Sequence, residues 1–313
     1  MTVDTPPAID IRGLSKSYAT VNAVNGLDLR VEAGELFALV GPDGAGKTTT
    51  IRMACGIAKP DSGSIAIFGH DIARDPGWIK ANVGYFSQRF TLYGDLTVDE
   101  NIEFFARIHG VGDFREKREK LLAFTRLEPF RRRLAEKLSG GMKQKLALAC
   151  TLIHAPRVVL LDEPTTGVDP VSRREFWLIL SELLHQGITI LMSTPYLDEA
   201  ERATRVGLMH QGRLLAMDRP GRIRESMKGT VMEIVCSDTR GARGPLRLTG
   251  AFDDIQLFGD RLNVVVGDVS GAEAVVRDAL GQAGIDVTSV RAVPSSLENA
   301  FISLVKAERG AAR

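Results

Sequence analysis

A glycine-rich segment in the first third of the chain has the residue types needed to hold a phosphate. It runs from Gly41 to Lys47 and Thr48 with the spacing G-x-x-x-x-G-K-[ST]. Glycines let the backbone wrap a phosphate with its N–H groups pointing inward, and a helix that starts there adds its positive dipole end. Lys47 would reach the β- and γ-phosphates, and Thr48 would offer a hydroxyl to Mg²⁺. The nucleotide contacts predicted here are Gly41, Pro42, Asp43, Gly44, Ala45, Gly46, Lys47, Thr48 and Thr49.

Two adjacent carboxylates form a second chemical group. Asp162 and Glu163 directly follow the four apolar residues 158–161, which are typical of a buried strand. Asp162 can hold Mg²⁺ directly or through a water, and Glu163 can orient and deprotonate an attacking water. A buried acidic pair without partners would be costly, so a metal and a phosphate ligand explain the two residues better. The sequence lacks the Asn-Lys-x-Asp motif that reads guanine, which favours ATP over GTP.

A third motif lies at residues 138–144, which read Leu-Ser-Gly-Gly-Met-Lys-Gln. A lone Ser-Gly-Gly is by default a helix cap. Together with the two motifs above, however, the segment resembles the signature of ABC-type ATPases, over about residues 9–225. That resemblance implies a head-to-tail dimer in which each ATP lies between the phosphate loop of one domain and the signature of the other. The signature residues expected to contact nucleotide are Ser139, Gly140, Gly141 and Gln144.

Three further positions take their expected roles from the same resemblance. Tyr18 matches the aromatic residue that stacks on adenine, and Gln88 matches the glutamine that contacts Mg²⁺ and senses the transmembrane partner. The alternatives are that Tyr18 is an ordinary exposed aromatic residue of a strand and that Gln88 is an ordinary surface amide. Residues 167–169 resemble the loop that couples the two sites of the dimer, with Val168 in place of the usual leucine. The predicted catalytic residues are thus Glu163, Lys47 and Gln88, and the predicted magnesium ligands are Thr48, Gln88 and Asp162.

One position departs from the family pattern. ABC-type ATPases usually place a histidine after a strand to contact the γ-phosphate, and here Pro195 stands at that position, after Ser193 and Thr194. Proline can neither donate a hydrogen bond nor carry charge. Loss of one transition-state donor typically lowers the rate by about 10²–10³. Either this chain's own ATP site is slow while its signature serves a partner's site, or another group replaces the histidine, with Tyr196 the nearest candidate.

The elements that must position these residues form an α/β fold. Short apolar strands at residues 36–40, 158–161 and 188–192 alternate with helical segments, which indicates a wound parallel sheet. The resemblance implies a P-loop NTPase of ABC type, with an antiparallel β subdomain and a helical insert. We predict an ATPase domain over residues 1–229, with a helical subdomain at about 90–156, and a small C-terminal α/β domain over 230–313. In that last domain the pattern predicts strands, Gly-rich turns, a helix at about 272–283 and a final helix ending near residue 305.

Composition limits the possible partners of the 313-residue chain. Its 40 basic and 39 acidic residues give a net charge of +1, so charge-driven nucleic-acid binding is not expected. No apolar run reaches the roughly 18 residues of a spanning helix, so we expect a membrane role to come through a separate integral membrane subunit. The chain would then lie peripherally on the cytoplasmic face of the cell membrane. Residues 88–97 and 298–301 resemble subunits of multidrug and antibiotic exporters.

The sequence leaves three functions open. The first is a transporter ATPase that works as a dimer of identical or different subunits and powers transport, with export favoured, through a membrane partner. The second is a catalytically weak clamp that ATP closes, as Pro195 suggests. The third is an ABC ATPase not linked to transport, for example one that acts on ribosomes or DNA. Such proteins typically carry tandem ATPase domains or coiled-coil inserts, and the sequence contains a single set of motifs.

Overall fold

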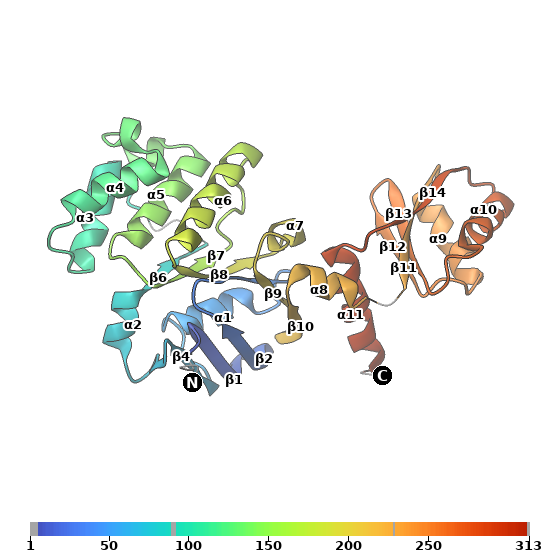
Figure 1. Ribbon diagram of the computed structural model, residues 1–313, viewed down its shortest axis with the longest axis horizontal. Helices are drawn as coiled ribbons and strands as arrows, with labels where there is room; N and C mark the ends of the chain where they lie inside the picture. Colours follow the sequence, from blue (N-terminus) through green and yellow to red (C-terminus); the bar gives the residue numbers. More distant parts are fainter. Residues whose placement is uncertain (1–5, 89–91, 228, 312–313) are drawn as a thin grey trace. The chain divides into compact units, whose positions relative to one another are not determined.

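The computed structural model describes residues 6–88, 92–227 and 229–311. Residues 89–91 of the exporter-like stretch, and residue 228 beside the predicted domain junction, lie outside the described residues. The chain divides into two compact units, Met1–Met217 and Asp218–Arg313 (Figure 1). This division falls before α8 (Pro220–Glu225), because α8 packs with α11 (Leu297–Ala311) inside the second unit. The functional boundary at residue 229 stays a prediction.

A six-stranded sheet forms the centre of the first unit. Its strands are β3 (Leu36–Val40), β6 (Val83–Phe86), β7 (Val158–Asp162), β8 (Thr189–Thr194), β9 (Arg205–His210) and β10 (Arg213–Asp218). They lie in the order β10-β9-β3-β8-β7-β6, and β9-β3-β8-β7-β6 pair in parallel. Every residue of β3, β7 and β8 is buried, which accounts for their continuous apolar runs in the sequence.

A second, antiparallel sheet lies beside the helix that follows β3. It has the order β2-β1-β4-β5 and is formed by β1 (Ile9–Tyr18), β2 (Val21–Val31), β4 (Ser62–Ile67) and β5 (His70–Asp71). Helix α1 (Lys47–Ala54) buries Ile51 and Met53 in the core shared by the two sheets. Burial of each such side chain contributes roughly 1.5–3 kcal/mol. The expected antiparallel β subdomain is confirmed, and this shared core fixes α1 directly behind the glycine-rich loop.

The helical insert has its own core. It contains α3 (Val98–Ile108), α4 (Arg115–Thr125), two short 3₁₀ turns (Glu128–Phe130 and Ala135–Lys137) and α5 (Gly140–Leu152). Thr97 and Glu100 form a capping box that fixes the start of α3. The remaining helices of the first unit are α2 (Pro76–Asn82), α6 (Pro170–His185) and α7 (Leu197–Ala200). Helix α6 packs beside α5, as Figure 1 shows.

The second unit is an antiparallel sheet with helices. Its strands β11 (Thr230–Cys236), β12 (Asp254–Phe258), β13 (Arg261–Val266) and β14 (Val287–Val293) have the order β12-β13-β11-β14. Helix α10 (Ala272–Gln282) is confirmed, and α11 extends beyond the predicted end. The predicted Gly-rich turns do not describe the segment between β11 and β13, because α9 (Thr239–Leu248) and β12 lie there. Helix α9 escapes notice because it contains two glycines and Pro245 and buries only Ala242 and Leu246.

Candidate nucleotide site

Three neighbouring parallel strands bring the motif residues to one edge of the sheet. Strand β8 lies between β3 and β7, so the ends of all three strands meet there. The end of β3 leads into the glycine-rich loop, β7 ends at Asp162, and β8 ends at Ser193 and Thr194. The carboxyl edge of a parallel sheet is the usual place for a ligand in such folds.

The loop at residues 41–46 follows a path that its glycines make possible. Gly46 has a φ of +105°, and a Cβ added there would lie 2.2 Å from the carbonyl oxygen of Ala23. A Cβ added at Gly41 would lie 2.1 Å from the carbonyl oxygen of Met209. Any side chain at either position would therefore displace the backbone of β2 or β9. These close approaches hold the loop against β2 and β9, and the loop leads into the start of α1, where backbone N–H groups can bind an anion.

Lys47 places a buried positive charge inside this loop. Its side chain is 3% exposed, and its Nζ donates hydrogen bonds to the carbonyl oxygens of Gly41 (2.8 Å) and Pro42 (3.0 Å). The Nζ also lies 3.7 Å from Oε1 of Glu163. Burial lowers the pKa of Lys47, and the carboxylate of Glu163 opposes that shift. The ammonium group therefore lies where a nucleotide's phosphates would need charge compensation.

Asp162 fits the role of a magnesium ligand. The side chain is fully buried, and its Oδ1 accepts hydrogen bonds from Oγ1 of Thr48 (2.9 Å) and Oγ of Ser193 (2.7 Å). Its Oδ2 is buried with no hydrogen-bond partner among the described residues. A buried carboxylate oxygen without a partner is costly. Mg²⁺ prefers oxygen ligands of this kind, so the donor set of Thr48 and Asp162 fits the ion.

Glu163 is held in a strained but well-connected position. Its φ of +48° is unusual for a residue with a side chain. Its Oε2 accepts hydrogen bonds from Nε2 of Gln88 (2.9 Å) and Oγ1 of Thr166 (3.3 Å). Its backbone N–H donates to Oγ of Ser193 (3.0 Å). The structure thus brings Glu163 together with Lys47 and Gln88, the other two predicted catalytic residues.

The signature segment divides into an exposed and a buried part. Ser139 is the N-cap of α5, accepts a hydrogen bond from the backbone of Met142 at 3.3 Å, and is exposed, as is Gly140. Gly141 is buried, and a Cβ there would lie 2.2 Å from Oγ of Ser172 on α6. Gln144 is 5% exposed and lines a small cavity that Gln88 also lines. Of the four residues predicted to contact nucleotide, only Ser139 and Gly140 are open to a partner.

Two further positions that the sequence singled out, Tyr18 and Pro195, lie at the end of β1 and just after β8. Tyr18 ends β1, pairs with Val21 and is 48% exposed, with Nζ of Lys16 at 5.4 Å from its ring centre. Pro195 follows β8, and the next residue, Tyr196, packs its ring against the guanidinium of Arg173 at 5.1 Å. The ring of Tyr196 therefore contacts α6.

Known proteins are similar to this chain in both sequence and fold. A family model described as "ABC transporter" matches residues 24–166. The daunorubicin/doxorubicin resistance ATP-binding protein DrrA of Streptomyces peucetius is 33% identical over 97% of this chain and 94% of its own length. The chain belongs to the ABC transporter ATP-binding proteins. Nod factor export ATP-binding protein I of Paraburkholderia xenovorans is 37% identical, over 96% of this chain and 98% of that protein.

Other proteins similar to this ABC protein match a smaller share of the chain. A protein of Escherichia coli named "Probable multidrug ABC transporter ATP-binding protein YbhF" is 50% identical over 71% of this chain, which spans 39% of that relative's length. A solved ATP-binding subunit of an ABC transporter is 31% identical with a TM-score of 0.64, over 70% of this chain and 92% of that one. These matches confirm the predicted fold class and an ATP-binding domain of a family of ATPases.

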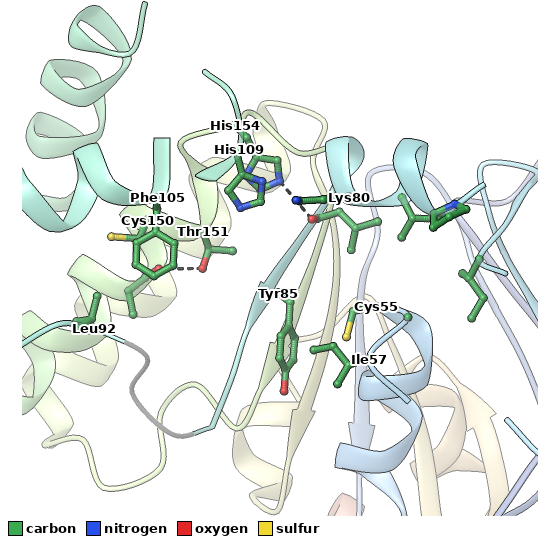
Figure 2. Close-up of a pocket in the computed structure, with 16 residues that line it drawn as sticks. Cys55, Ile57, Lys80, Tyr85, Leu92, Phe105, His109, Cys150, Thr151 and His154 are labelled. Atoms are coloured by element: carbon green, nitrogen blue, oxygen red, sulfur yellow. Dashed lines mark hydrogen bonds between the residues drawn. The ribbon is translucent and has the colours of Figure 1, made fainter. Parts of the chain in front are cut away.

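A groove on the first unit of this ABC protein adjoins the nucleotide site. It has a volume of about 390 Å³, and Figure 2 shows residues from the turn after α1 and from α2, β6, α3 and α5 around it. Three of its residues, Tyr85, Ala147 and Thr151, also line the small cavity beside Gln88. Ile57, at its edge, is 63% exposed. The groove therefore reaches from an apolar surface to the immediate surroundings of Gln88.

The sequence motifs did not identify every residue that supports this site. Ser193 is the main omission, because its hydroxyl binds both Asp162 and the backbone of Glu163. Its signal was present in the sequence as a hydroxyl residue at the end of a buried strand. Its role could be seen only once β8 was known to lie beside β7.

Within the described parts of the chain, no helix has the length and apolar character needed to cross a bilayer.

Proposed function

We propose that this chain is the ATP-hydrolysing subunit of an exporter whose transport path lies in a separate membrane protein. The observation that carries the proposal is the joint placement of Lys47, Asp162 and Glu163 at the carboxyl edge of the parallel sheet. The names of the relatives, which concern multidrug transport, daunorubicin resistance and Nod factor export, support export as the direction.

In this proposal the residues of the site divide the reaction among them. Lys47 binds the β- and γ-phosphates, and Thr48 and Asp162 hold Mg²⁺ with Gln88 close by. Bound Mg²⁺ supplies positive charge to the phosphate oxygens. Glu163 orients the attacking water and accepts its proton. The hydrogen bonds from Gln88 and Thr166 orient the Glu163 carboxylate, and the ion pair with Lys47 holds its other oxygen.

A second ATPase subunit completes the proposed site. The exposed Ser139 and Gly140 at the start of α5 are available to a γ-phosphate held by another subunit. A solved ATP-binding cassette with ADP and Pi, described as a dimer, is 25% identical with a TM-score of 0.62, over 67% of this chain and 98% of that one. Gly141 and Gln144 would support this contact from behind, since both are buried.

Pro195 sets the expected rate of this chain's own site. The proline ring offers no donor to the γ-phosphate, and Tyr196 contacts Arg173 on α6. We therefore favour slow hydrolysis over replacement of the histidine by Tyr196. A rate in the usual range for such enzymes, lost on the change Tyr196→Phe, would favour the replacement instead.

The groove between the turn after α1 and the elements α2, β6, α3 and α5 is the proposed docking surface for the membrane subunit. Its apolar residues and the exposed Ile57 would bury surface on binding, and its link to the cavity beside Gln88 would connect docking to the reaction. The chain would then be attached peripherally to the cytoplasmic face of the membrane.

Co-expression with candidate membrane subunits tests the proposal. We expect the chain to be recovered in the membrane fraction only together with its partner, and to stay there in a high-salt wash because the contact is apolar. An ABC ATPase not linked to transport would be recovered in the same fraction with and without every membrane partner.

A further inference from the structure

A buried carboxylate outside the described site connects three segments around it. Glu199, in the short turn α7, is 1% exposed. Its Oε1 accepts a hydrogen bond from Oγ1 of Thr165 at 2.5 Å, and its Oε2 accepts one from Oγ1 of Thr194 at 2.8 Å. Nε of Arg173, on α6, lies 3.5 Å from Oε1. We call these four residues the Glu199 cluster.

The connections of Glu199 are more specific than burial requires. A buried carboxylate needs hydrogen bonds and a positive charge to offset the loss of water. Any nearby backbone N–H groups would supply the hydrogen bonds, yet both oxygens here bind side-chain hydroxyls. One hydroxyl comes from the loop after Glu163 and the other from the end of β8. The carboxylate therefore ties two loops of the nucleotide site to each other.

The first of these loops carries Glu163. Thr165 lies two residues beyond it, and the backbone N–H groups of Thr166 and Val168 donate to the carbonyl oxygens of Glu163 (3.3 Å) and Thr165 (3.1 Å). The φ of +48° at Glu163 is unfavourable and persists only where surrounding contacts fix it. The hydrogen bond between Thr165 and Glu199 is one of those contacts.

The second loop carries Pro195. Oγ1 of Thr194 accepts a hydrogen bond from the backbone N–H of Tyr196 at 3.0 Å and donates its own proton to Glu199. The guanidinium of Arg173 covers the ring of Tyr196 and reaches the same carboxylate. The turn at residues 194–196 is thus fixed from both sides, although the side chain at 195 makes no hydrogen bond of its own.

We propose that Glu199 is a positioning residue for ATP hydrolysis. This proposal rests on the proposed role of Glu163 as the base. Through Thr165 it holds the backbone of the Glu163 loop in its strained conformation. Through Thr194 it fixes that loop to the end of β8. The Glu199 cluster thereby adds a second link between the two loops, besides the hydrogen bonds of Ser193 with Asp162 and Glu163, in a chain that has proline at position 195.

Substitutions of Thr165 test the proposal with little change in volume. Thr165→Val removes the hydroxyl, and Thr165→Ser keeps it. We expect Thr165→Val to lower kcat for Mg·ATP about tenfold, because one hydrogen bond to a charged group is lost. KM should stay within about twofold, because the phosphate loop is untouched, and Thr165→Ser should restore kcat to within about twofold of the wild type. Glu199→Gln should lower kcat in the same way.

A matched control separates positioning from general destabilisation. Thr125 is fully buried in α4, and its hydroxyl donates to the carbonyl oxygen of Leu121 at 2.7 Å. Thr125→Val should lower the unfolding temperature about as much as Thr165→Val and leave kcat unchanged. Hydrogen exchange at the backbone amides of Thr166 and Val168 should accelerate in Thr165→Val only.

The outcomes distinguish this proposal from the one on which it rests. If the wild type hydrolyses ATP and Thr165→Val keeps the wild-type kcat, the positioning role is wrong and the proposed function stands. Equal losses of kcat in Thr165→Val and Thr165→Ser, or a loss of kcat in Thr125→Val that matches its loss of stability, would also overturn it. A wild type that binds ATP without hydrolysing it in any assembly overturns both proposals.

Discussion

The nucleotide site and the groove beside it lie in the same unit. The site contains buried charged side chains, whereas the groove is lined mainly by apolar ones. Lys47, Asp162 and Glu163 are each at most 8% exposed; Lys47 and Glu163 form an ion pair, and Asp162 accepts hydrogen bonds from Thr48 and Ser193. The groove is lined mainly by apolar side chains, and its two histidines, His109 and His154, stack with ring centres 4.0 Å apart. Burial lowers the pKa of both rings, so both are neutral near pH 7.

This contrast indicates a division of labour. Burial of a charged group costs free energy, and such groups are retained where the charge of a ligand offsets that cost. Phosphate and Mg²⁺ would do so at the nucleotide site. A partly exposed apolar groove is retained where another surface covers it. Changes in the first region should therefore stop the reaction in the isolated chain. Changes in the second should leave that reaction intact and affect attachment to the membrane subunit.

The largest effect is expected from Lys47→Ala. The change removes the positive charge from the phosphate loop and leaves Glu163 without its ion-pair partner. We expect ATP affinity to fall about tenfold or more and turnover to fall by at least about 10³, since charged phosphate contacts are worth roughly 1.5–3 kcal/mol each. Fluorescent-nucleotide titration and phosphate release measure the two quantities. Wild-type turnover in Lys47→Ala would remove the basis for a charge-dependent site.

The groove should respond in the opposite way to Ile57→Glu. A carboxylate at this 63% exposed position would be buried on docking. We expect recovery with the membrane subunit to fall more than tenfold while Mg·ATP turnover of the isolated chain stays within about twofold. Leu178→Glu is the matched control, because Leu178 on α6 is 58% exposed and lies outside the groove. Equal recovery of the Ile57→Glu and Leu178→Glu variants would place the docking surface elsewhere.

The smallest effect concerns the neutral histidines of the groove. Burial lowers the pKa of His154 to about 4, below the unfolded value of about 6.5, with His109 and Lys117 adding to the shift. The unfolded chain therefore binds the proton more readily between those values, and stability falls as the pH drops from about 6.5 to about 4. Because the ring is partly exposed, we expect this to cost about 1 kcal/mol at pH 5.

Urea unfolding at pH 7.5 and pH 5 measures this difference. His154→Gln should reduce the loss of stability on acidification, and His185→Gln, at an exposed position on α6, should not. The same acid sensitivity in wild type and His154→Gln would show that the groove does not hold this histidine neutral. The contrast between a charged nucleotide site and a neutral groove would then no longer hold for this histidine.

The sequence predicted the parts of the molecule whose signals are local. The glycine-rich loop and the Asp162–Glu163 pair each lie at the end of a buried apolar strand, and Ser139 lies at the start of a helix. In each case the residue type and the neighbouring strand or helix indicate the same role. The Glu199 cluster escaped prediction, because Thr165 and Glu199 are 34 positions apart and meet only through the placement of β8 beside β7. Helix α9 was missed because its glycines and proline outweigh its two buried residues.

The most direct test of the central claim compares Mg·ATP turnover by the purified chain and by Glu163→Gln. The substitution keeps the size of the side chain and its contact with Gln88, and it removes the carboxylate that accepts the proton. We predict slow turnover by the wild type, a loss of at least about 10²-fold in the variant and ATP affinity within about twofold. Equal turnover by both proteins would contradict the assignment of Glu163 as the base.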